Sequence, residues 1–584
     1  MRGVSTAICL FAALASAESL AATYHGEYPS GERLALATSF VLGRDAVVRA
    51  RPDAGQRSAE DRGIVLAQAD SIVTDGAVDG GVRFEIRSYQ VEGNTLLPQP
   101  DIERLLARYT GKLKDFGDVQ RALEALQGRY QAAGYAGILV LLPEQELDRG
   151  DVVFKVIEPK LGRIIVEGNE HFSADNARRS VPALQPGTTP NTREVAASVK
   201  VANESPAKQT AVLLRPGSRE GEVDAVIRVA DVPPVRYSLS FDNTGNKETG
   251  TYRTAFSYQH ANLFGRDHVL TLQYVTSPRN TNDVEVYGLG YRIPLYGLGD
   301  SIDLIAGYST VDSGTVQNLF DVSGQGAIYA FRYNHNLRKL GEFEHRLVYG
   351  IDYRAYQNLV TPVGGNFNFV PDITVHPVSV TYSGLSRGQQ SDVNFYIGYA
   401  QNLPDGNDGI DADFKNSRRD ARAAYRIWRM GGVYTRAFLK DWQFRLKADT
   451  QYSRDALIAA EQFGLGGADS IRGFNERYMS NDKGFRSNWE IYTPNFGDFA
   501  GLENAKLRFL AFYDTGQVGR NSRQPGELER VSMDSVGFGV RMTHGNNLSV
   551  KADFAQVLHD GSQFGTEAGR THGNRWHISI GYVF

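Results

Sequence analysis

The chain has 584 residues, with 63 Lys and Arg against 67 Asp and Glu, and a formal net charge of −4. Nucleic-acid binders normally show a basic excess, so we expect no nucleic-acid partner. Hydrophobic residues make up 41%, which is low for a helical membrane protein, whereas 61 Gly, 29 Tyr and 29 Phe suit β-structure with many turns and aromatic girdles.

The N-terminus has the features of a secretion signal. Arg2 gives a positive start, residues 3–17 carry no charge, and Ala15-Ser16-Ala17 offers a cleavage site, so we predict a signal peptide over residues 1–17. The single cysteine, Cys9, lies inside this segment, which leaves the mature chain without a disulfide or a cysteine-bound metal. No later segment has 18 uncharged apolar residues, so the chain would have to cross a membrane with strands.

Residues 18–82 are mixed in character. Residues 32–44 could form one short helix. Residues 45–82 are rich in Asp, Gly, Arg and Ala, which is typical of a linker. We therefore predict a helix and a linker in front of the first folded domain.

An internal repeat comes next. Val91-Glu92-Gly93-Asn94 recurs as Val166-Glu167-Gly168-Asn169. Each copy follows a strand-like run (84–91 and 161–166) and precedes a helical pattern and two further strand-like runs. In the first copy, one helix face collects apolar side chains, namely Val119, Leu123, Leu126 and Tyr130. The pattern predicts two α+β domains, 83–158 and 159–233, each ordered strand, helices, strand, strand.

From about residue 235 onward, apolar and polar residues alternate with a period of two. Trp442, Phe444 and Leu446 fall on one face of a strand, with Gln443 and Arg445 on the other. The predicted strands are 236–243, 251–260, 267–276, 283–293, 300–309, 326–336, 344–355, 375–384, 391–402, 421–438, 441–453, 485–493, 505–515, 534–544, 547–556 and 575–584. Links after even-numbered strands tend to be short, and several after odd-numbered strands are long.

This pattern predicts a transmembrane antiparallel β-barrel of about 16 strands over residues 235–584. Strands near ten residues suit a tilted membrane span, and an even number with unequal links is the rule in bacterial outer-membrane barrels. The outer face would contact outer-membrane lipids. The last strand alternates Trp576, Ile578, Ile580, Tyr582 and Phe584 up to the chain end, which is similar to the signal read by the barrel-assembly machinery.

Two short motifs make the likeness to a known family specific. Ile471-Arg472-Gly473-Phe474 lies on the predicted outer loop between the eleventh and twelfth strands. Phe512 and Asp514 lie on the thirteenth predicted strand, and Gly516 follows its last residue, in the sequence FYDTG. With the paired domains, these motifs resemble the two-partner secretion transporters, the hemolysin secretion/activation proteins of the POTRA-bearing barrel superfamily, over residues 83–584.

The resemblance implies a structure and a function. The two domains would be periplasmic POTRA domains, and the barrel would lie in the cell outer membrane. The long loop would fold back into the barrel, so that Arg472 meets Asp514 on the inner wall. An unfolded partner exoprotein, such as a hemolysin or an adhesin, would be secreted and in some cases activated through the pore. By position alone, residues 32–44 would be the helix that plugs the pore, and no cofactor is implied.

Three other interpretations are open at the level of sequence. An assembly or insertase factor of the same superfamily would carry more POTRA domains than the two repeats here. A passive porin would not need the paired domains. An enzyme is suggested only by Gly384-x-Ser386-x-Gly388, which lacks the strand-turn-helix context of a nucleophile, so we predict no catalytic residue. The acidic stretch 405–413 does not complete a calcium-binding pattern, and we predict no metal site.

Overall fold

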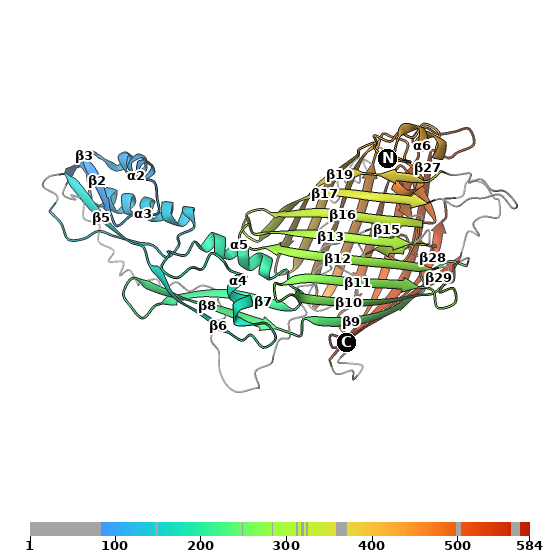
Figure 1. Ribbon diagram of the computed structural model, residues 1–584, viewed down its shortest axis with the longest axis horizontal. Coiled ribbons are helices and arrows are strands. Elements are labelled where there is room, and N and C mark those ends of the chain that lie inside the picture. The colour runs from blue at the N-terminus through green and yellow to red at the C-terminus, as the bar shows by residue number, and fades with distance from the viewer. Residues whose placement is uncertain are drawn as a thin grey trace.

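The computed structural model describes residues 83–584 apart from 147–149, 248, 283, 311–313, 317–319, 323–324, 358–370, 498–500, 502–503 and 562–572. The predicted signal peptide, helix 32–44 and linker therefore lie outside the described residues. Two small α+β units lead into a large closed barrel and stand at one end of it (Figure 1). We call this the near end of the barrel and the opposite end the far end.

The first unit packs helices against a three-stranded sheet. The strand order is β2-β5-β4, with β2 parallel and β4 antiparallel to β5, and β1 pairs separately with β3. Helix α3 begins at a capping box between Asp115 and Asp118 and ends at Gly134, whose φ of 101° is a conformation that glycine favours. The elements are β1 (Phe84–Ile86), β2 (Ser88–Glu92), α2 (Gln99–Leu106), η1 (Ala107–Tyr109), β3 (Gly111–Lys114), α3 (Phe116–Ala133), β4 (Leu139–Leu141) and β5 (Asp151–Ile157).

The second unit has the same topology. Its sheet has the order β6-β8-β7, with β6 parallel and β7 antiparallel to β8. Two helices cover the sheet, and their apolar side chains join its core. The elements are β6 (Lys160–Glu167), α4 (Ala174–Arg179), α5 (Thr192–Ala202), β7 (Lys208–Pro216) and β8 (Glu222–Asp231).

The repeated Val-Glu-Gly-Asn sequence makes the same turn in both units. Gly93 and Gly168 have φ of 81° and 78°, and a Cβ on them would lie 2.4 and 2.5 Å from a carbonyl oxygen of the neighbouring strand. Glycine is therefore required at both positions. The side-chain amides of Asn94 and Asn169 each donate to the carbonyl oxygen three residues later, at 2.9 and 2.8 Å. The repeat in the sequence is thus a repeat of local structure.

The barrel is a closed antiparallel sheet in which β29 pairs with β9. Strands β18 and β19 keep one register against β17, with Arg354 opposite Val375 and Ile351 opposite Val378, so they form one strand interrupted at His376. The barrel therefore has sixteen strands, at the places that the alternation predicts. They are β9 (Val235–Asp242), β10 (Arg253–Leu263), β11 (His268–Thr276), β12 (Glu285–Leu295), β13 (Asp300–Ser309), β16 (Gln325–Asn336), β17 (Phe343–Gln357), β18 and β19 (Ile373–Val375 and Pro377–Arg387), β20 (Ser391–Asn402), β21 (Arg426–Phe438), β22 (Trp442–Tyr452), β25 (Lys483–Tyr492), β26 (Ala505–Gly519), β27 (Arg530–His544), β28 (Leu548–His559) and β29 (Asn574–Val583).

The alternation sorts side chains between the two faces of the barrel. The four tryptophans, Trp428, Trp442, Trp489 and Trp576, are 38–50% exposed on the outer face. Their chain neighbours face inward, where polar side chains are buried; Gln443 is 3% exposed and His577 is 4% exposed. An apolar outer band around a polar lumen is the arrangement of a membrane barrel. Among the described residues, no helix is both long enough and apolar enough to cross a membrane.

Short elements lie in the links that join consecutive strands at the far end of the barrel. They are β14 (Gly314–Val316), β15 (Phe320–Val322), α6 (Asp411–Ser417), η2 (Ala459–Glu461), β23 (Phe463–Leu465) and β24 (Met479–Asn481). The acidic stretch 405–413 leads into α6, whose Phe414 is buried beside Tyr425 and Leu457. The far end therefore has a small apolar core of its own.

The structure departs from the predicted strands in the first unit. The predicted strand 84–91 is broken at Arg87, where the main-chain N–H groups of Arg87 and Ser88 both donate to the carbonyl oxygen of Gly150. The residues on either side pair with different sheets. The first of the two further strand-like runs in this copy covers residues 136–142, and only the three residues of β4 form a strand there.

Candidate functional site: a loop anchored in the barrel lumen

The segment between β22 and β25, residues 453–482, folds back against the inner wall of the barrel. We call it the lumenal loop. It turns through the hairpin β23–β24, and Ile471 is fully buried while Phe474 is 6% exposed. These side chains lie in one cluster with Val518, Met533 and Val557, which belong to β26, β27 and β28. Apolar contact therefore holds the loop against three consecutive strands.

Arg472 lies at the centre of this contact and grips Asp514 of β26. Its Nε donates to Oδ2 of Asp514 and its Nη2 donates to Oδ1, each at 2.7 Å. The main-chain N–H of Arg472 also donates to Oδ2 at 3.0 Å, and the amide of Asn488 donates to Oδ1 at 2.8 Å. Arg472 is 2% exposed and Asp514 is 0% exposed. A two-pronged contact fixes the direction of the guanidinium as well as its distance.

Two further carboxylates approach the same guanidinium. Nη1 of Arg472 lies 2.9 Å from Glu490 of β25 and 3.5 Å from Asp553 of β28. Arg445 lies 2.9 Å from Glu490, and Arg541 lies 2.7 Å from Asp553. The network thus balances three arginines against three carboxylates. All of these side chains except that of Arg445 are at most 7% exposed, so loss of one member would leave a buried charge without its partner.

The strand motif shapes the floor of the site. The guanidinium carbon of Arg472 lies 3.4 Å from the ring centre of Phe512, a cation–π contact within the lumen. At Gly516, a Cβ would come within 2.9 Å of side-chain atoms of Ile471 and Leu465. Each of the three motif positions on β26 therefore has a steric or electrostatic reason for its residue type.

The loop motif continues into a contact with the last strand. Gly473 has a φ of 98°, in the left-handed region, and its N–H donates to Nε2 of His577 at 2.9 Å. Phe474 packs against Tyr478 of the same loop, with ring centres 5.2 Å apart. Ile471, Arg472, Gly473 and Phe474 are therefore all inside the barrel, and together they touch strands from β25 to β29.

Sequence reasoning missed Glu490, Asp553 and His577. They lie on three different strands and belong to no short motif. The available signal was their position on the polar face of an alternating strand, which they share with many lumenal residues. Only the closed barrel brings them to Arg472.

The terminal-strand residues lie on the outer face, away from this site. Trp576, Ile578, Ile580, Tyr582 and Phe584 are 40–67% exposed. The N–H of Phe584 donates to the carbonyl oxygen of Tyr237 in β9, so the chain end is part of the closing seam.

The second unit is fastened to the near end of the barrel by a buried polar cluster. Nζ of Lys208 donates to Asp267 at 2.7 Å and to Asn176 at 2.8 Å. Asp267, in the turn between β10 and β11, also accepts from the hydroxyl of Tyr296 at 2.6 Å. Burial lowers the pKa of Lys208, and the carboxylate of Asp267 opposes that shift. The unit and the barrel wall therefore share an ion pair that water does not screen.

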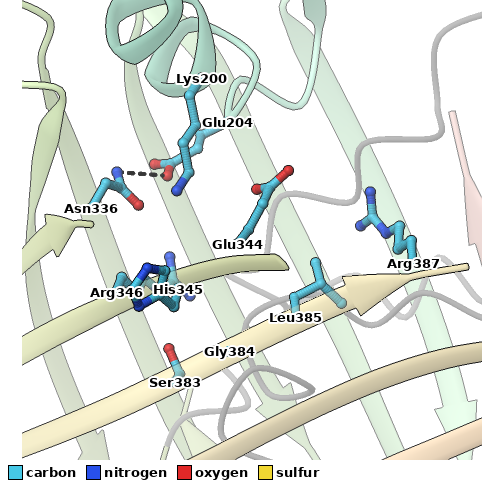
Figure 2. A pocket seen from close by; sticks show the side chains of 10 residues that line it. All are labelled: Lys200, Glu204, Asn336, Glu344, His345, Arg346, Ser383, Gly384, Leu385 and Arg387. Atoms are coloured by element: carbon cyan, nitrogen blue, oxygen red, sulfur yellow. Dashed lines mark hydrogen bonds between the residues drawn. The ribbon is translucent and has the colours of Figure 1, made fainter. Parts of the chain in front are cut away.

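A cleft opens beside this interface, between α5 and the near ends of β16, β17 and β19 (Figure 2). Lys200 projects from α5, and Glu204 follows two residues after the end of this helix. The amide of Asn336 donates to Glu204 at 3.4 Å. The sequence Gly384-x-Ser386-x-Gly388 ends β19 beside the cleft and turns directly into β20. It therefore lacks the helix that a nucleophile elbow needs. No group of metal-ligating side chains occurs in the described part of the chain.

The sequence and the fold are similar to those of known outer-membrane transporters. The chain is 25% identical over 500 residues to the outer membrane transporter CdiB of Dickeya dadantii, covering 81% of this chain and 84% of that one. It is 22% identical over 566 residues to the heme/hemopexin transporter protein HuxB of Haemophilus influenzae, covering 90% and 94%. The solved structure of CdiB from Escherichia coli superposes with a TM-score of 0.66 at 20% identity, covering 89% of this chain and 93% of that one.

Family profiles match two parts of the chain. Residues 84–159 match the ShlB-type POTRA domain. Residues 221–542 match the haemolysin secretion/activation protein ShlB/FhaC/HecB. The chain therefore belongs to the haemolysin secretion/activation protein family, and it is a two-partner secretion transporter of the outer membrane, with its POTRA region in the periplasm and its barrel in the membrane.

Proposed function

We propose that the lumenal loop is a stopper that closes an export pore at rest, alongside the plug of residues 32–44, and that Arg472 holds the loop in its closed position. The two-pronged contact between Arg472 and Asp514 carries this proposal, because it fixes the loop inside the lumen with charges that water does not screen. A partner exoprotein in transit displaces the loop and takes its place in the lumen. The loop returns when the chain has passed.

The unfolded partner first meets the two units in front of the barrel. Residues 83–158 and 159–233 act as two POTRA domains, and their shared topology supports this assignment for the second unit. In the first unit, β4 is an edge strand with Leu139 and Leu141 exposed. An extended chain adds to such an edge through main-chain hydrogen bonds. Folding outside the cell then gives the movement its direction.

The remaining segments serve delivery and closure. Residues 1–17 direct the chain across the inner membrane, and residues 32–44 plug the pore at rest. The barrel-assembly machinery reads the terminal strand with Trp576 and Phe584. Outer-membrane lipids contact the exposed aromatic side chains of the barrel, which includes the four outward tryptophans.

Secretion of the cognate exoprotein tests the proposal. Deletion of residues 83–233 should abolish the partner in the medium while the barrel still reaches the outer membrane. An unchanged level of secreted partner would contradict capture by the two units. Loss of many unrelated barrels from the membrane would instead indicate an assembly factor.

Single-channel recording then locates the plug. Full-length protein should give small, flickering currents, and deletion of residues 18–82 should make them larger and steadier. Equal currents from both would remove the plug assignment and leave the lumenal loop as the only stopper.

A further inference from the structure

The lumenal loop makes a second buried ionic contact, at a distance from Arg472 along the chain. Glu461, at the end of η2, is 2% exposed. Its Oε1 lies 2.8 Å from Nη1 of Arg354, and its Oε2 lies 3.2 Å from Nη2 of Arg429. The hydroxyl of Tyr356 donates to Oε1 at 3.1 Å. The carboxylate is therefore held from both sides.

These partners stand on the opposite flank of the loop from the Arg472 network. Arg354 and Tyr356 belong to β17, and Arg429 belongs to β21. In the strand order, β21 and β17 precede β22, from which the loop departs, whereas the partners of Arg472 lie on β25, β26 and β28. The loop thus reaches the wall in two directions within eleven positions (472 − 461).

The two contacts have opposite polarity. At Arg472 the loop supplies the cation and the wall supplies carboxylates. At Glu461 the loop supplies the carboxylate and the wall supplies cations. If the loop shifted so that each charged residue faced the other's site, Arg472 would meet wall arginines and Glu461 would meet wall carboxylates. Repulsion between these like charges disfavours such a shifted position of the loop. The polarity therefore defines one position for the loop.

The wall arginines at the second contact have partners of their own. Arg354 lies 2.6 Å from Asp352, and Nε of Arg429 donates to Gln451 at 2.9 Å. If Glu461 left, both guanidinium groups would keep a hydrogen-bond acceptor. The free-energy cost of moving the loop away would therefore be smaller than it would be if Glu461 were the sole partner of these buried arginines. Such a contact can form and break repeatedly.

We propose that Glu461 is a second anchor of the lumenal loop, a positioning residue that must release together with Arg472 before the lumen opens to the exported chain. This inference rests on the proposed role of the loop as a stopper. Arg472 fixes the tip of the loop, which is the part between β23 and β24 (residues 466–478). Glu461 fixes the first arm of the loop, which is the part before β23 (residues 453–462), against β17 and β21. Release of one anchor alone frees one part of the loop and leaves the other seated.

Thiol labelling of intact cells tests each anchor separately, with a maleimide-polyethylene glycol as the probe and Cys9→Ser as the background. Ile458→Cys reports on the first arm, and Ser470→Cys reports on the tip; both positions are at most 4% exposed. Glu461→Gln should speed labelling at position 458 by about tenfold or more, with a much smaller effect at position 470. Glu461→Asp, which keeps the charge, should recover part of the protection.

Glu476→Gln is the matched control in the same loop, because the carboxylate of Glu476 accepts from the N–H of Ala468 within the loop. It should leave the rate at position 458 unchanged. A rate in Glu461→Gln equal to that of this control would overturn the second anchor. The second anchor would also be overturned if Glu461→Gln accelerated labelling equally at positions 458 and 470 and abolished the band of folded barrel that resists heating on a denaturing gel. That combination would mean that the whole barrel is destabilised.

The combined variant separates this inference from the proposal beneath it. In bilayer recordings in KCl, Glu461→Gln with Asp514→Asn should hold the pore open for longer than either change alone. If Asp514→Asn does not speed labelling at position 470, the stopper role itself fails. If Asp514→Asn speeds it but the combined variant opens no more than Asp514→Asn alone, the stopper role stands and the second anchor fails.

Discussion

Asp514→Asn is the most direct perturbation of the lumenal loop. The carboxylate accepts four hydrogen bonds, three from Arg472 and one from Asn488. An asparagine keeps one acceptor oxygen and turns an NH₂ group toward these donors. At least one contact of Arg472 then becomes a donor facing a donor, and the negative charge opposite the guanidinium is lost. The side chain keeps its size, so the wall is not otherwise disturbed.

The size of the effect follows from the network. Loss of one partner from a buried ion pair costs about 3–5 kcal/mol. Arg472 retains Glu490 and Asp553 nearby, so the lower end applies. A cost of about 3 kcal/mol shifts the equilibrium for release of the loop by about two powers of ten. The fraction of time that the pore spends in its large-conductance state should rise by the same factor.

Planar-bilayer recording measures this fraction, and Asp303→Asn is the matched control. Asp303 accepts from Nε and Nη2 of Arg292 at 2.6 and 3.0 Å, a buried fork of the same kind between β12 and β13. That variant weakens the barrel wall without touching the loop. If Asp514→Asn and Asp303→Asn gave the same currents, the reasoning that the fork holds the loop would be refuted.

Three further changes test other parts of the structure. Gly516→Ala should displace the loop, because the new methyl group would lie within 2.9 Å of the side chain of Ile471, and such overpacking costs about 1–3 kcal/mol. The maleimide labelling rate of Ser470→Cys should therefore rise, and an unchanged labelling rate would contradict the close fit. Lys208→Met should leave the buried carboxylate of Asp267 without its cation, at a cost of about 3–5 kcal/mol, and so separate the second unit from the barrel. Faster amide exchange in β7, with unchanged exchange in the barrel strands, would show this separation. Hydrogen bonds from Arg163 lower the pKa of Asp224. The ionised carboxylate therefore stabilises the folded unit at pH above the pKa of an unfolded aspartate, and this stabilisation is lost as the pH falls toward the lower pKa of the folded state. Protection of β6 and β8 against amide exchange should accordingly decrease below about pH 4. Asp224→Asn should remove that pH dependence.

The barrel was predictable because its physics is periodic. Each strand passes between lipid and lumen, so side chains must alternate, and no other segment competes for that pattern. The sixteen strands follow the alternation closely. The repeat in the first two units was predictable for another reason: Gly93 and Gly168 each make a turn that no other residue fits.

The site was only half visible in the sequence. Arg472 and Asp514 stand in short motifs, but their neighbours come from strands that the closed sheet brings together. Glu461 is one of 67 acidic residues, and no local pattern distinguishes it. Its role depends on Arg354 and Arg429, which lie 107 and 32 positions away. Contacts of this kind depend on register and barrel closure, which alternation alone does not define.

The division of labour between apolar and charged contacts explains how such a loop can both seal and move. Ile471 and Phe474 pack against the wall and exclude water, but apolar contact has no preferred direction. The charged anchors supply the direction. When the tip departs, Glu490 keeps Arg445 and Asp553 keeps Arg541, so the wall that meets the exported chain still has these charges paired. A passing polypeptide therefore meets fewer free charges that could trap it, and the same carboxylates are in place to receive Arg472 when the loop returns.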